Sequence, residues 1–442
     1  MYVGIGTGKS ESWIRHKIKC RKKMVFLNNK VAVVGISCIV PGAKKYNELW
    51  DNLINKRENL TRMETGDSED MRWPHIGVSG CIEDFAGTPI PGIAEYLIPF
   101  VDPQFSLLYT LVGQAIEDCL GNVYDEDRRT GVFCSSDSSF DWRRKIVLPA
   151  HLQNPFHLKE VSYVSENQYY SSMISYLYGF TGQSVGVGAA CASSLAAVHM
   201  AASSLLLGDI DCGIAGGVSI QESHKNGYFY DERLIYSKSG TCRTFDQEAD
   251  GTIPSDGGGI VVLKRLEDAI EDGDRIYSVI SGSAMNNDGK RTMGYTVPSI
   301  DGISEAVQCS MDIAEIDAEQ FSFLEFHGTG THFGDCIEFT AFTEALNTSK
   351  RNYCAIGSIK PNIGYLECAS GVLGLIKTVL SVYKKVFPPT IHLRNLNRDI
   401  EIEDSPFYVN TENICLNSDR IVGGVNAYGD GGNNVFVIVE GF

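Results

Sequence analysis

"SVGVGAACASSLAAVHMAASSLLLG", residues 184–208, joins a short apolar run to a long helical stretch through a turn of small residues. The run "SVGVGAA" is typical of a buried strand, and "ASSLAAVHMAASSLLLG" is typical of the helix that follows such a strand. Gly208 closes the helix. One face of that helix is apolar and carries Leu195, Val198, Ala202, Leu205 and Leu206. The stretch therefore predicts a strand–turn–helix unit with Cys191 at the turn.

The same alternation of short apolar runs and helical stretches continues over most of the chain from Lys30 onward. Further runs typical of buried strands are "KVAVVGIS", "TGVFCSS", "CGIAGG", "GGIVVLKRL", "YSVISGS", "FSFLEF" and "NVFVIVE". Helices are expected at 104–120, 192–207, 302–314, 335–347 and 370–385. This pattern favours an α/β protein with mostly parallel sheets that helices cover on both faces.

The composition is that of an ordinary soluble globular protein, with 442 residues, 43% hydrophobic and 21% charged. The net charge of −17 argues against a nucleic-acid-binding surface, which would need clustered Lys and Arg. No segment resembles a secretion signal or a membrane span, and the longest candidate, 370–385, is interrupted by Lys377. We therefore expect no nucleic-acid partner and no membrane association.

The cysteines indicate a reducing compartment. Their number is odd, 13, and no two are spaced as C-x-x-C, so neither a zinc ribbon nor a thioredoxin motif is present. We expect a cytoplasmic protein without a metal site. Residues 1–28 form a basic N-terminal extension, and "GIGTGKS" within it lacks the first glycine and the preceding strand of a phosphate-binding loop. No composition change marks a boundary in the rest of the chain.

Cys191 has two interpretations. Free cysteine is among the most buried residue types, and its small neighbours suit tight packing. A cysteine at a helix N-terminus can also be a nucleophile, because the helix dipole favours the thiolate and lowers the thiol pKa. Backbone N–H groups at such a turn can hold a developing oxyanion.

A partner for a nucleophilic cysteine is offered by "FLEFHGTGTHFGD", residues 323–335. His327 follows an apolar run and precedes glycines that let backbone approach a ligand, while Thr329 and Thr331 can hydrogen-bond it. A histidine that caps a turn is the alternative, and His332 and His199 are weaker candidates for the base. Spacing alone does not join Cys191 to His327.

Ten stretches in order resemble motifs of the β-ketoacyl synthase (ketosynthase) family, in particular the modular polyketide synthase type. They are "VAVVGISCIVPGA", "VDPQFSLL", "GVGAACASSLAAVH", "IAGGVSI", "CRTFDQEADG", "NNDGKRTMGYTVPS", "EFHGTGTHFGD", "IGSIKPNIGY", "VFPPTIH" and "NAYGDGGNN". The resemblance runs from about Lys30 to Glu440. It implies the thiolase fold, with two similar α/β halves in a five-layer α-β-α-β-α arrangement, at residues 29–275 and 276–442. It also implies a homodimer.

The resemblance also implies roles for individual residues. Cys191 matches the nucleophile that takes an acyl chain from a thioester, His327 the first catalytic histidine, and Lys360 the lysine that organises the site. Asp430 falls in the gating loop, whose amide would complete an oxyanion hole with that of Cys191. Substrate contacts are implied for Thr329, Thr331, Asn362, Gly429 and Asn433. No cofactor is implied beyond the phosphopantetheine of an acyl carrier protein.

The departures from the family pattern cluster in the same motifs. Tyr365 stands where the family has a second histidine, and a tyrosine with a pKa near 10 is a poor proton shuttle. The family's Asp-Thr-Ala-Cys-Ser-Ser-Ser is "GAACASS" here, Arg-Gly-Glu-Gly is "PSDG", and the glycine-rich loop ends Gly432-Asn433-Asn434. These changes indicate an altered reaction or substrate. Drift is the alternative, and the retention of Cys191, His327, Lys360 and the glycines argues against full loss of activity.

The expected function is a ketosynthase-like acyltransferase of polyketide or hybrid biosynthesis with weakened or replaced decarboxylative condensation. An ordinary condensing ketosynthase and a non-elongating one are the alternatives. A structural or length-determining partner of another ketosynthase ranks last, because such proteins typically lack the cysteine. The chain ends at Phe442, soon after the last expected strand, so carriers and extender units are expected in trans unless this is an excised domain.

Overall fold

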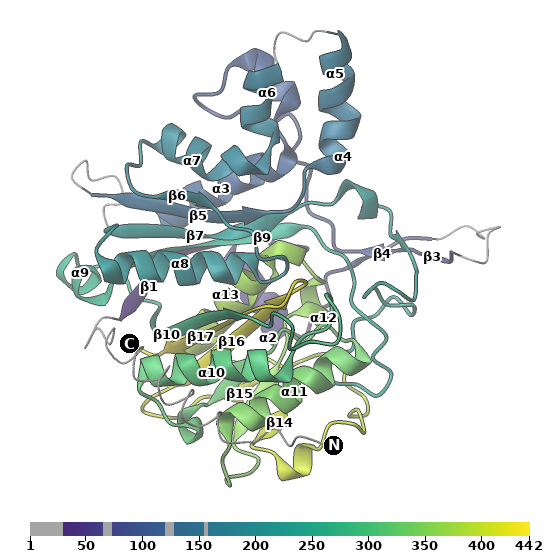
Figure 1. Ribbon diagram of the computed structural model, residues 1–442, viewed down its shortest axis with the longest axis vertical. Helices are drawn as coiled ribbons and strands as arrows, with labels where there is room; N and C mark the ends of the chain where they lie inside the picture. The colour runs from purple at the N-terminus through teal and green to yellow at the C-terminus, as the bar shows by residue number, and fades with distance from the viewer. Residues whose placement is uncertain (1–29, 65–72, 120–127, 154–157) are drawn as a thin grey trace, which may run out of the picture.

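The computed structural model describes residues 30–64, 73–119, 128–153 and 158–442 (Figure 1). The predicted basic extension, 1–28, lies outside these residues. The architecture is built around one large mixed sheet whose strand order is β14-β12-β11-β16-β17-β10-β1-β9-β7-β5-β6.

The sheet consists of two halves with the same pairing pattern. The first half contains β1 (Val31–Ile39), β5 (Thr130–Ser136), β6 (Ser184–Gly186), β7 (Cys212–Ser219) and β9 (Gly257–Arg265). The second half contains β10 (Ser278–Asn287), β11 (Phe323–Glu325), β12 (Cys354–Gly357), β14 (Phe407–Val409), β16 (Val422–Gly429) and β17 (Asn433–Glu440). The halves meet where β1 pairs antiparallel with β10, and the division predicted at 275/276 falls just before β10.

The expectation of mostly parallel sheets is wrong. Parallel pairing joins β5 to β6 and β7, β11 to β12 and β16, and β12 to β14. The strands between these groups are antiparallel, because β9 runs back between β7 and β1, and β17 runs back between β16 and β10. Both mixed half-sheets are buried on both faces, so their strands carry the continuous apolar runs that are also typical of parallel sheets.

Helices cover the half-sheets in three layers, as Figure 1 shows. The helices are α3 (Pro103–Asp118) and α7 (Tyr170–Tyr178) outside the first half, α10 (Ile300–Ala314) and α11 (His332–Leu346) outside the second, and α8 (Ser193–Leu207) and α13 (Ser370–Lys384) between them. Five predicted helices are therefore present with ends shifted by up to three residues. One shift has a clear cause: the Ser299 side chain caps α10 by accepting a hydrogen bond from the Gly302 amide.

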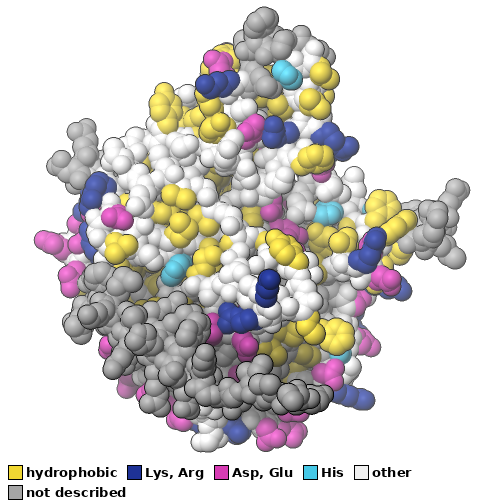
Figure 2. Space-filling view, viewed as in Figure 1, with side chains coloured by type: hydrophobic (Ala, Val, Ile, Leu, Met, Phe, Trp, Pro, Cys, Tyr) yellow, Lys and Arg dark blue, Asp and Glu magenta, His cyan; other side chains and the backbone are white. Residues whose placement is uncertain are grey.

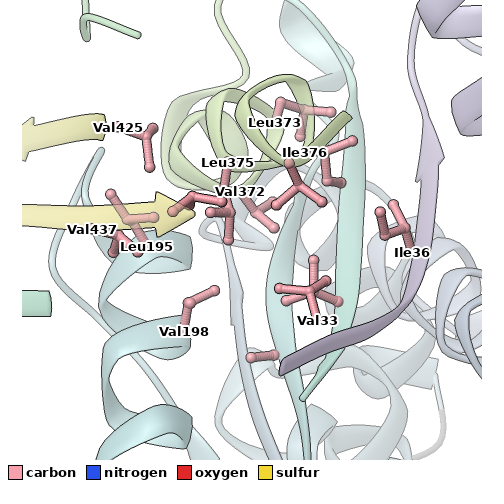
Figure 3. Close-up of a cluster of buried hydrophobic side chains, with 14 of the residues drawn as sticks. Val33, Ile36, Leu195, Val198, Val372, Leu373, Leu375, Ile376, Val425 and Val437 are labelled. Atoms are coloured by element: carbon pink, nitrogen blue, oxygen red, sulfur yellow. The ribbon is translucent and has the colours of Figure 1, made fainter. Parts of the chain in front are cut away.

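Side chains that alternate along the strands point into three hydrophobic cores between these layers. On β5, Phe133 faces the central core, while Val132 and Cys134 face the outer core under α3. On β17, Val437 faces the central core and Phe436 the outer core under α10 and α11. Figure 3 shows the central core with side chains from β1, α8, α13, β16 and β17. This is the thiolase-like α/β fold, and its layers are those of the predicted five-layer arrangement.

The two central helices touch at their N-terminal ends. A Cβ on Gly371 would lie 2.8 Å from the Cβ of Leu195, so only glycine lets α13 approach α8 this closely. The Ser194 hydroxyl also accepts a hydrogen bond of 3.0 Å from the Val372 amide. This contact brings the turn before α8 against the segment before α13.

The remaining elements are short and lie in connections. They are α2 (Tyr46–Ile54), β2 (Thr61–Arg62), β3 (His75–Ile76), β4 (Val78–Ser79), η2 (Glu95–Phe100), α4 (Phe140–Trp142), η3 (Arg143–Val147), α5 (Leu148–Gln153), α6 (Leu158–Ser165), η5 (Asn167–Tyr169), η6 (Glu222–His224), β8 (Tyr228–Phe229), α9 (Leu266–Glu271), η7 (Ala318–Gln320), α12 (Lys360–Ile363), η8 (Glu367–Ala369), β13 (Val386–Phe387), η9 (Ile402–Asp404) and β15 (Ile414–Cys415).

One described stretch, Ala190–Leu207, is apolar and long enough to cross a membrane by composition, and 61% of it is buried inside the protein. It forms α8 of the central layer, so its apolarity is that of a core helix. The stretch 370–385 is likewise a buried core helix, α13. On the face shown in Figure 2, hydrophobic and charged side chains are intermixed, and Lys and Arg occur in small separate groups.

Candidate active site

Cys191 lies in the turn between β6 and α8, as the sequence predicts. The expected strand ends early, at Gly186, because the chain then turns, and Ala190 has a left-handed φ of 49°. The Ser193 hydroxyl fixes the turn by accepting from the Ala189 amide at 2.8 Å and donating to the Ala190 carbonyl at 2.5 Å. Cys191 as a whole is half-buried and its sulfur packs against other side chains, so it is not a simple core cysteine.

The sulfur of Cys191 faces two groups. Oε2 of Glu367 lies 3.9 Å away, and the hydroxyl of Tyr365 is within hydrogen-bonding reach. Burial, followed by the charge of Glu367, raises the pKa of the Cys191 thiol to about 12. The expected lowering of this pKa by the helix N-terminus is therefore wrong in direction. Desolvation of the thiolate and repulsion by nearby carboxylates outweigh the helix dipole.

His327 follows β11 and is held by its backbone. Its amide and that of Gly328 donate to Oε1 and Oε2 of Glu338 at 2.7 and 2.9 Å, and Nζ of Lys360 donates to its carbonyl. Burial and the Lys360 charge hold the pKa of His327 well below its usual value, so the imidazole is neutral. Its Nδ1 has no hydrogen-bond partner among the described residues.

Tyr365 contacts both Cys191 and His327. Its ring stands edge-on to that of His327, with centroids 6.0 Å apart and planes at 85°. Its backbone pairs with the loop after Ile253, where the Tyr365 amide donates to the Ile253 carbonyl at 2.7 Å. Burial raises the pKa of the Tyr365 hydroxyl well above 10, so this group donates a hydrogen bond and does not act as a base. Lys360 is buried beside the ring, and burial lowers its pKa.

The loop that begins at Gly429, where the resemblance places a gating loop, lies directly on the turn that carries Cys191. A Cβ on Gly429 would lie 2.8 Å from the amide nitrogen of Cys191 and 2.6 Å from the carbonyl oxygen of Ala189. The carboxyl of Asp430 raises the pKa of Cys191, and burial raises its own pKa. The structure thus places both predicted oxyanion-hole residues together, and their role as amide donors stays a prediction.

Of the other predicted substrate contacts, the two threonines lie near His327. The hydroxyl groups of Thr329 and Thr331 are hydrogen-bonded to each other at 3.0 Å. Thr329 also hydrogen-bonds Tyr428, whose ring centroid lies 4.3 Å from that of His327. Asn362 is buried and donates to the Arg57 carbonyl at 3.0 Å.

Asn433 begins β17, where its side chain accepts from Asn287 at 3.3 Å. The described contacts of Asn362 and Asn433 are thus with the protein, and their contact with substrate stays a prediction. The weaker base candidates are held by other groups: His332 by Asp399 at 2.9 Å and His199 by Ser283 at 2.8 Å.

Sequence reasoning missed the carboxyl groups beside the sulfur. Burial and then the charge of Asp137 raise the pKa of Glu367 to about 7, while the Tyr236 hydroxyl donates to its Oε1 at 3.0 Å. Asp137 is half-buried after β5 and accepts a hydrogen bond from Ser219. The available signal was position: Glu367 comes two residues after Tyr365, and Asp137 directly follows a predicted strand.

A cavity of about 230 Å³ adjoins this region from the side of Asp137. Polar and aromatic side chains line it, among them Asp102, Gln104, Asp137, Phe140, Trp142 and Gln221. Asp137 and Gln221 also act on Glu367, whereas Cys191, His327 and Tyr365 do not line this cavity.

Comparison with known sequences shows to which family the chain belongs. The family model "Beta-ketoacyl synthase, N-terminal domain" matches residues 28–269, and "Beta-ketoacyl synthase, C-terminal domain" matches residues 277–394. The chain belongs to the β-ketoacyl synthase family. This family is a class of acyl-transferring enzymes, and the relatives below are polyketide synthases.

A phenolphthiocerol/phthiocerol polyketide synthase of Mycobacterium tuberculosis H37Rv is 35% identical over 437 residues, which cover 93% of this chain and 29% of that protein. Polyketide synthase PksN of Bacillus subtilis 168 is 34% identical over 433 residues, covering 94% of this chain and 8% of PksN. The chain therefore spans less than a third of either relative.

Solved ketosynthases share the fold. Ketosynthase twelve of the bacillaene polyketide synthase of Bacillus amyloliquefaciens matches with a TM-score of 0.86 and 30% identity, over 93% of this chain and 75% of that chain. The module 1 ketosynthase of bacillaene synthase from B. amyloliquefaciens FZB42 matches with a TM-score of 0.83 and 32% identity, over 93% and 76%.

Proposed function

We propose that this ketosynthase accepts an acyl group on Cys191 from a carrier-protein thioester and passes it to an acceptor with little or no decarboxylative condensation. The acyl group would arrive on the phosphopantetheine of an acyl carrier protein, and no other cofactor is needed. The observation that supports this proposal most directly is that the buried hydroxyl of Tyr365 faces the Cys191 sulfur. The sequence resemblance puts Tyr365 where the family has its second histidine.

Ordinary condensation needs a group that supports the loss of carbon dioxide while negative charge grows on the thioester oxygen. A buried phenol with a raised pKa can donate one hydrogen bond to that oxygen but cannot carry positive charge. His327 is the remaining imidazole, and it is neutral. Removal of one oxyanion donor typically costs about 3 kcal/mol, or a hundredfold or more in rate.

The charges around Cys191 support the same conclusion. The carboxyl groups of Glu367, Asp430 and Asp137 all act on its sulfur. The carboxylate of a malonyl unit would enter this negative surrounding, where like charges repel at short range. A neutral acyl thioester meets no such penalty.

The test is acyl loading measured beside decarboxylation. Intact mass after incubation with acyl-carrier thioesters should show one acyl group, lost in Cys191→Ala, while a malonyl carrier should release little carbon dioxide. Loading that survives in Cys191→Ala would refute the role of the cysteine. Decarboxylation at a rate usual for ketosynthases would make the chain an ordinary condensing enzyme, which retention of His327 and Lys360 would permit.

We also propose a cytoplasmic homodimer. No disulfide joins the described cysteines, which is consistent with a reducing compartment. The strand β6 (Ser184–Gly186) ends the described sheet and leaves an edge that can pair with a second copy. Light scattering at micromolar concentration should give twice the chain mass, and a monomer at that concentration would refute the dimer.

A further inference from the structure

The Cys191 thiol needs a group that takes its proton, because its raised pKa leaves it uncharged at neutral pH. Among the described residues, the acceptor that faces this thiol is Oε2 of Glu367, at 3.9 Å from the sulfur. The other oxygen of that carboxyl accepts from Tyr236 at 3.0 Å. One oxygen is thus fixed while the other faces the thiol, which is the arrangement that a general base requires.

The backbone of Glu367 is held in an unfavourable conformation. Its φ is +43°, in the left-handed region that non-glycine residues avoid. Neighbouring contacts fix this conformation: the Leu366 amide donates to the Ser370 hydroxyl at 3.0 Å, and the Ala369 amide donates to the Leu366 carbonyl at 2.8 Å. Strain that the surrounding structure maintains is typical of functional sites.

Charged and titratable groups surround Glu367 from several elements. They are Asp137 after β5, Tyr236 in the loop after β8, Tyr365 and Cys368 on either side in sequence, Asp430 in the loop after β16, and Cys191 itself, while the neutral amide of Gln221 donates a hydrogen bond. Burial and the negative neighbours raise the pKa of Glu367 to about 7, and Tyr236 lowers it. The carboxyl can therefore both accept and return a proton near neutral pH.

We propose that Glu367 is the general base for acyl transfer to Cys191 and that Tyr236 is its positioning residue. The proposal rests on the proposed function, because it takes Cys191 as the acyl acceptor. His327 makes no hydrogen bond with Cys191 among the described residues, and its ring contacts are with Tyr365 and Tyr428. Its imidazole is thus available to donate to the thioester oxygen.

The proposed acyl transfer needs no proton donor or acceptor besides Glu367, Cys191 and the thioester. The Glu367 carboxylate takes the thiol proton as the sulfur attacks the thioester carbonyl and forms the new C–S bond. The tetrahedral oxyanion then collapses and breaks the C–S bond to the donor. The departing thiolate takes the proton back from the Glu367 carboxylic acid and leaves as the thiol. Because proton removal accompanies bond formation, no free thiolate has to accumulate.

The test is the pH dependence of Cys191 acylation by an acyl N-acetylcysteamine thioester, followed by intact mass from pH 5 to 9. In the parent, the rate should rise to about pH 7, where Glu367 loses its proton, and then level off. In Glu367→Gln it should fall at least about a hundredfold at pH 7 and keep rising through pH 9, because only free thiolate then reacts.

Two further variants separate a catalytic from a structural role. Tyr236→Phe removes the donor that lowers the pKa of Glu367, so the inflection should move to higher pH. Glu367→Asp should restore part of the rate, because it keeps a carboxylate on a shorter side chain. The control is Glu440→Gln, which makes the same change at a buried glutamate on β17. Glu440 forms ion pairs with Lys30 and Arg420, and its replacement should leave the pH dependence of acylation as in the parent.

The decisive contrary result is an unchanged profile in Glu367→Gln. A rate loss without a change of pH dependence would also overturn the proposal, since it would indicate a structural role. Alkylation of Cys191 by iodoacetamide, followed by peptide mass, separates this from the proposed function. The parent could take up no acyl group while the alkylation of Cys191 still changes near pH 7 in the parent and not in Glu367→Gln. In that case the proposed acyl transfer is wrong, but the assignment of Glu367 as the base for the Cys191 thiol is supported.

Discussion

The ring of Tyr365 stands edge-on to the ring of His327, with centroids 6.0 Å apart and planes at 85°. The phenol thus lies beside His327, while its hydroxyl faces the sulfur of Cys191. Replacement of this one side chain tests the proposal that Tyr365 limits decarboxylation.

Tyr365→His should raise carbon dioxide release from a malonyl carrier by about a hundredfold, because it restores an imidazole at the thioester oxygen. Acyl loading should persist, since Cys191 and the turn before α8 are unchanged. Carbon dioxide and loaded mass are measured on the same samples. Tyr365→Phe is the matched control, and it should release no more carbon dioxide than the parent. An equal rise in both variants would show that loss of the hydroxyl is the cause.

Gly429→Ala should abolish acyl loading or reduce it at least about tenfold. The added Cβ would lie 2.6 Å from the Ala189 carbonyl oxygen and 2.8 Å from the Cys191 amide, so the loop or the nucleophile turn must move. Gly188→Ala is the control in the same turn, because its Cβ would meet nothing within 4 Å. Loading is followed by intact mass, and folding by the melting temperature. Parent-like loading in Gly429→Ala would show that the turn tolerates this displacement.

Asp430→Asn should lower the pKa of the Cys191 thiol and of the Glu367 carboxyl that faces it, because the Asp430 carboxyl is one of the groups that raise both. The pH at which iodoacetamide alkylation of Cys191 reaches half its maximal rate should fall. Peptide mass spectrometry distinguishes this cysteine from the others. Asp419→Asn makes the same change at an exposed position and should leave that pH unchanged. A shift toward higher pH would contradict the electrostatic account.

Stability should fall with rising pH in a way that depends on Asp256. Burial raises the pKa of this carboxyl to about 7, so the folded state holds a proton that the unfolded state releases near pH 4. The stabilising effect of that proton is complete below the unfolded pKa and is lost as pH rises through about 7. The loss is of the order of 4 kcal/mol.

Asp256→Asn should remove this component, so its stability relative to the parent should increase between pH 5 and 8. Chemical denaturation at several pH values measures the difference, with Asp419→Asn as the reference substitution. A difference that stays constant over this range would show that Asp256 does not carry the proton.

Much of the fold was predictable because its signals are local. The apolar face of 192–207 and the glycine that closes it depend on residues within one element, and α8 lies at Ser193–Leu207. The motifs around Cys191, His327 and Lys360 likewise gave the family. Strand direction was not predictable in the same way, because a strand buried on both faces carries the same apolar run in either orientation. The antiparallel return of β9 and β17 therefore went unpredicted.

The sequence by itself determined which residue types stand at the nucleophile turn, the histidine turn and the position of Tyr365. Only the tertiary structure decided how they act on one another. The approach of α13 to α8 at Gly371 brings Glu367 to 3.9 Å from the sulfur of Cys191, although the two residues are far apart in the chain. It also buries the thiol among carboxyl groups and reverses the expected direction of its pKa. Burial and charge are sums over all neighbours in space, and the order of residues along a chain does not contain that sum.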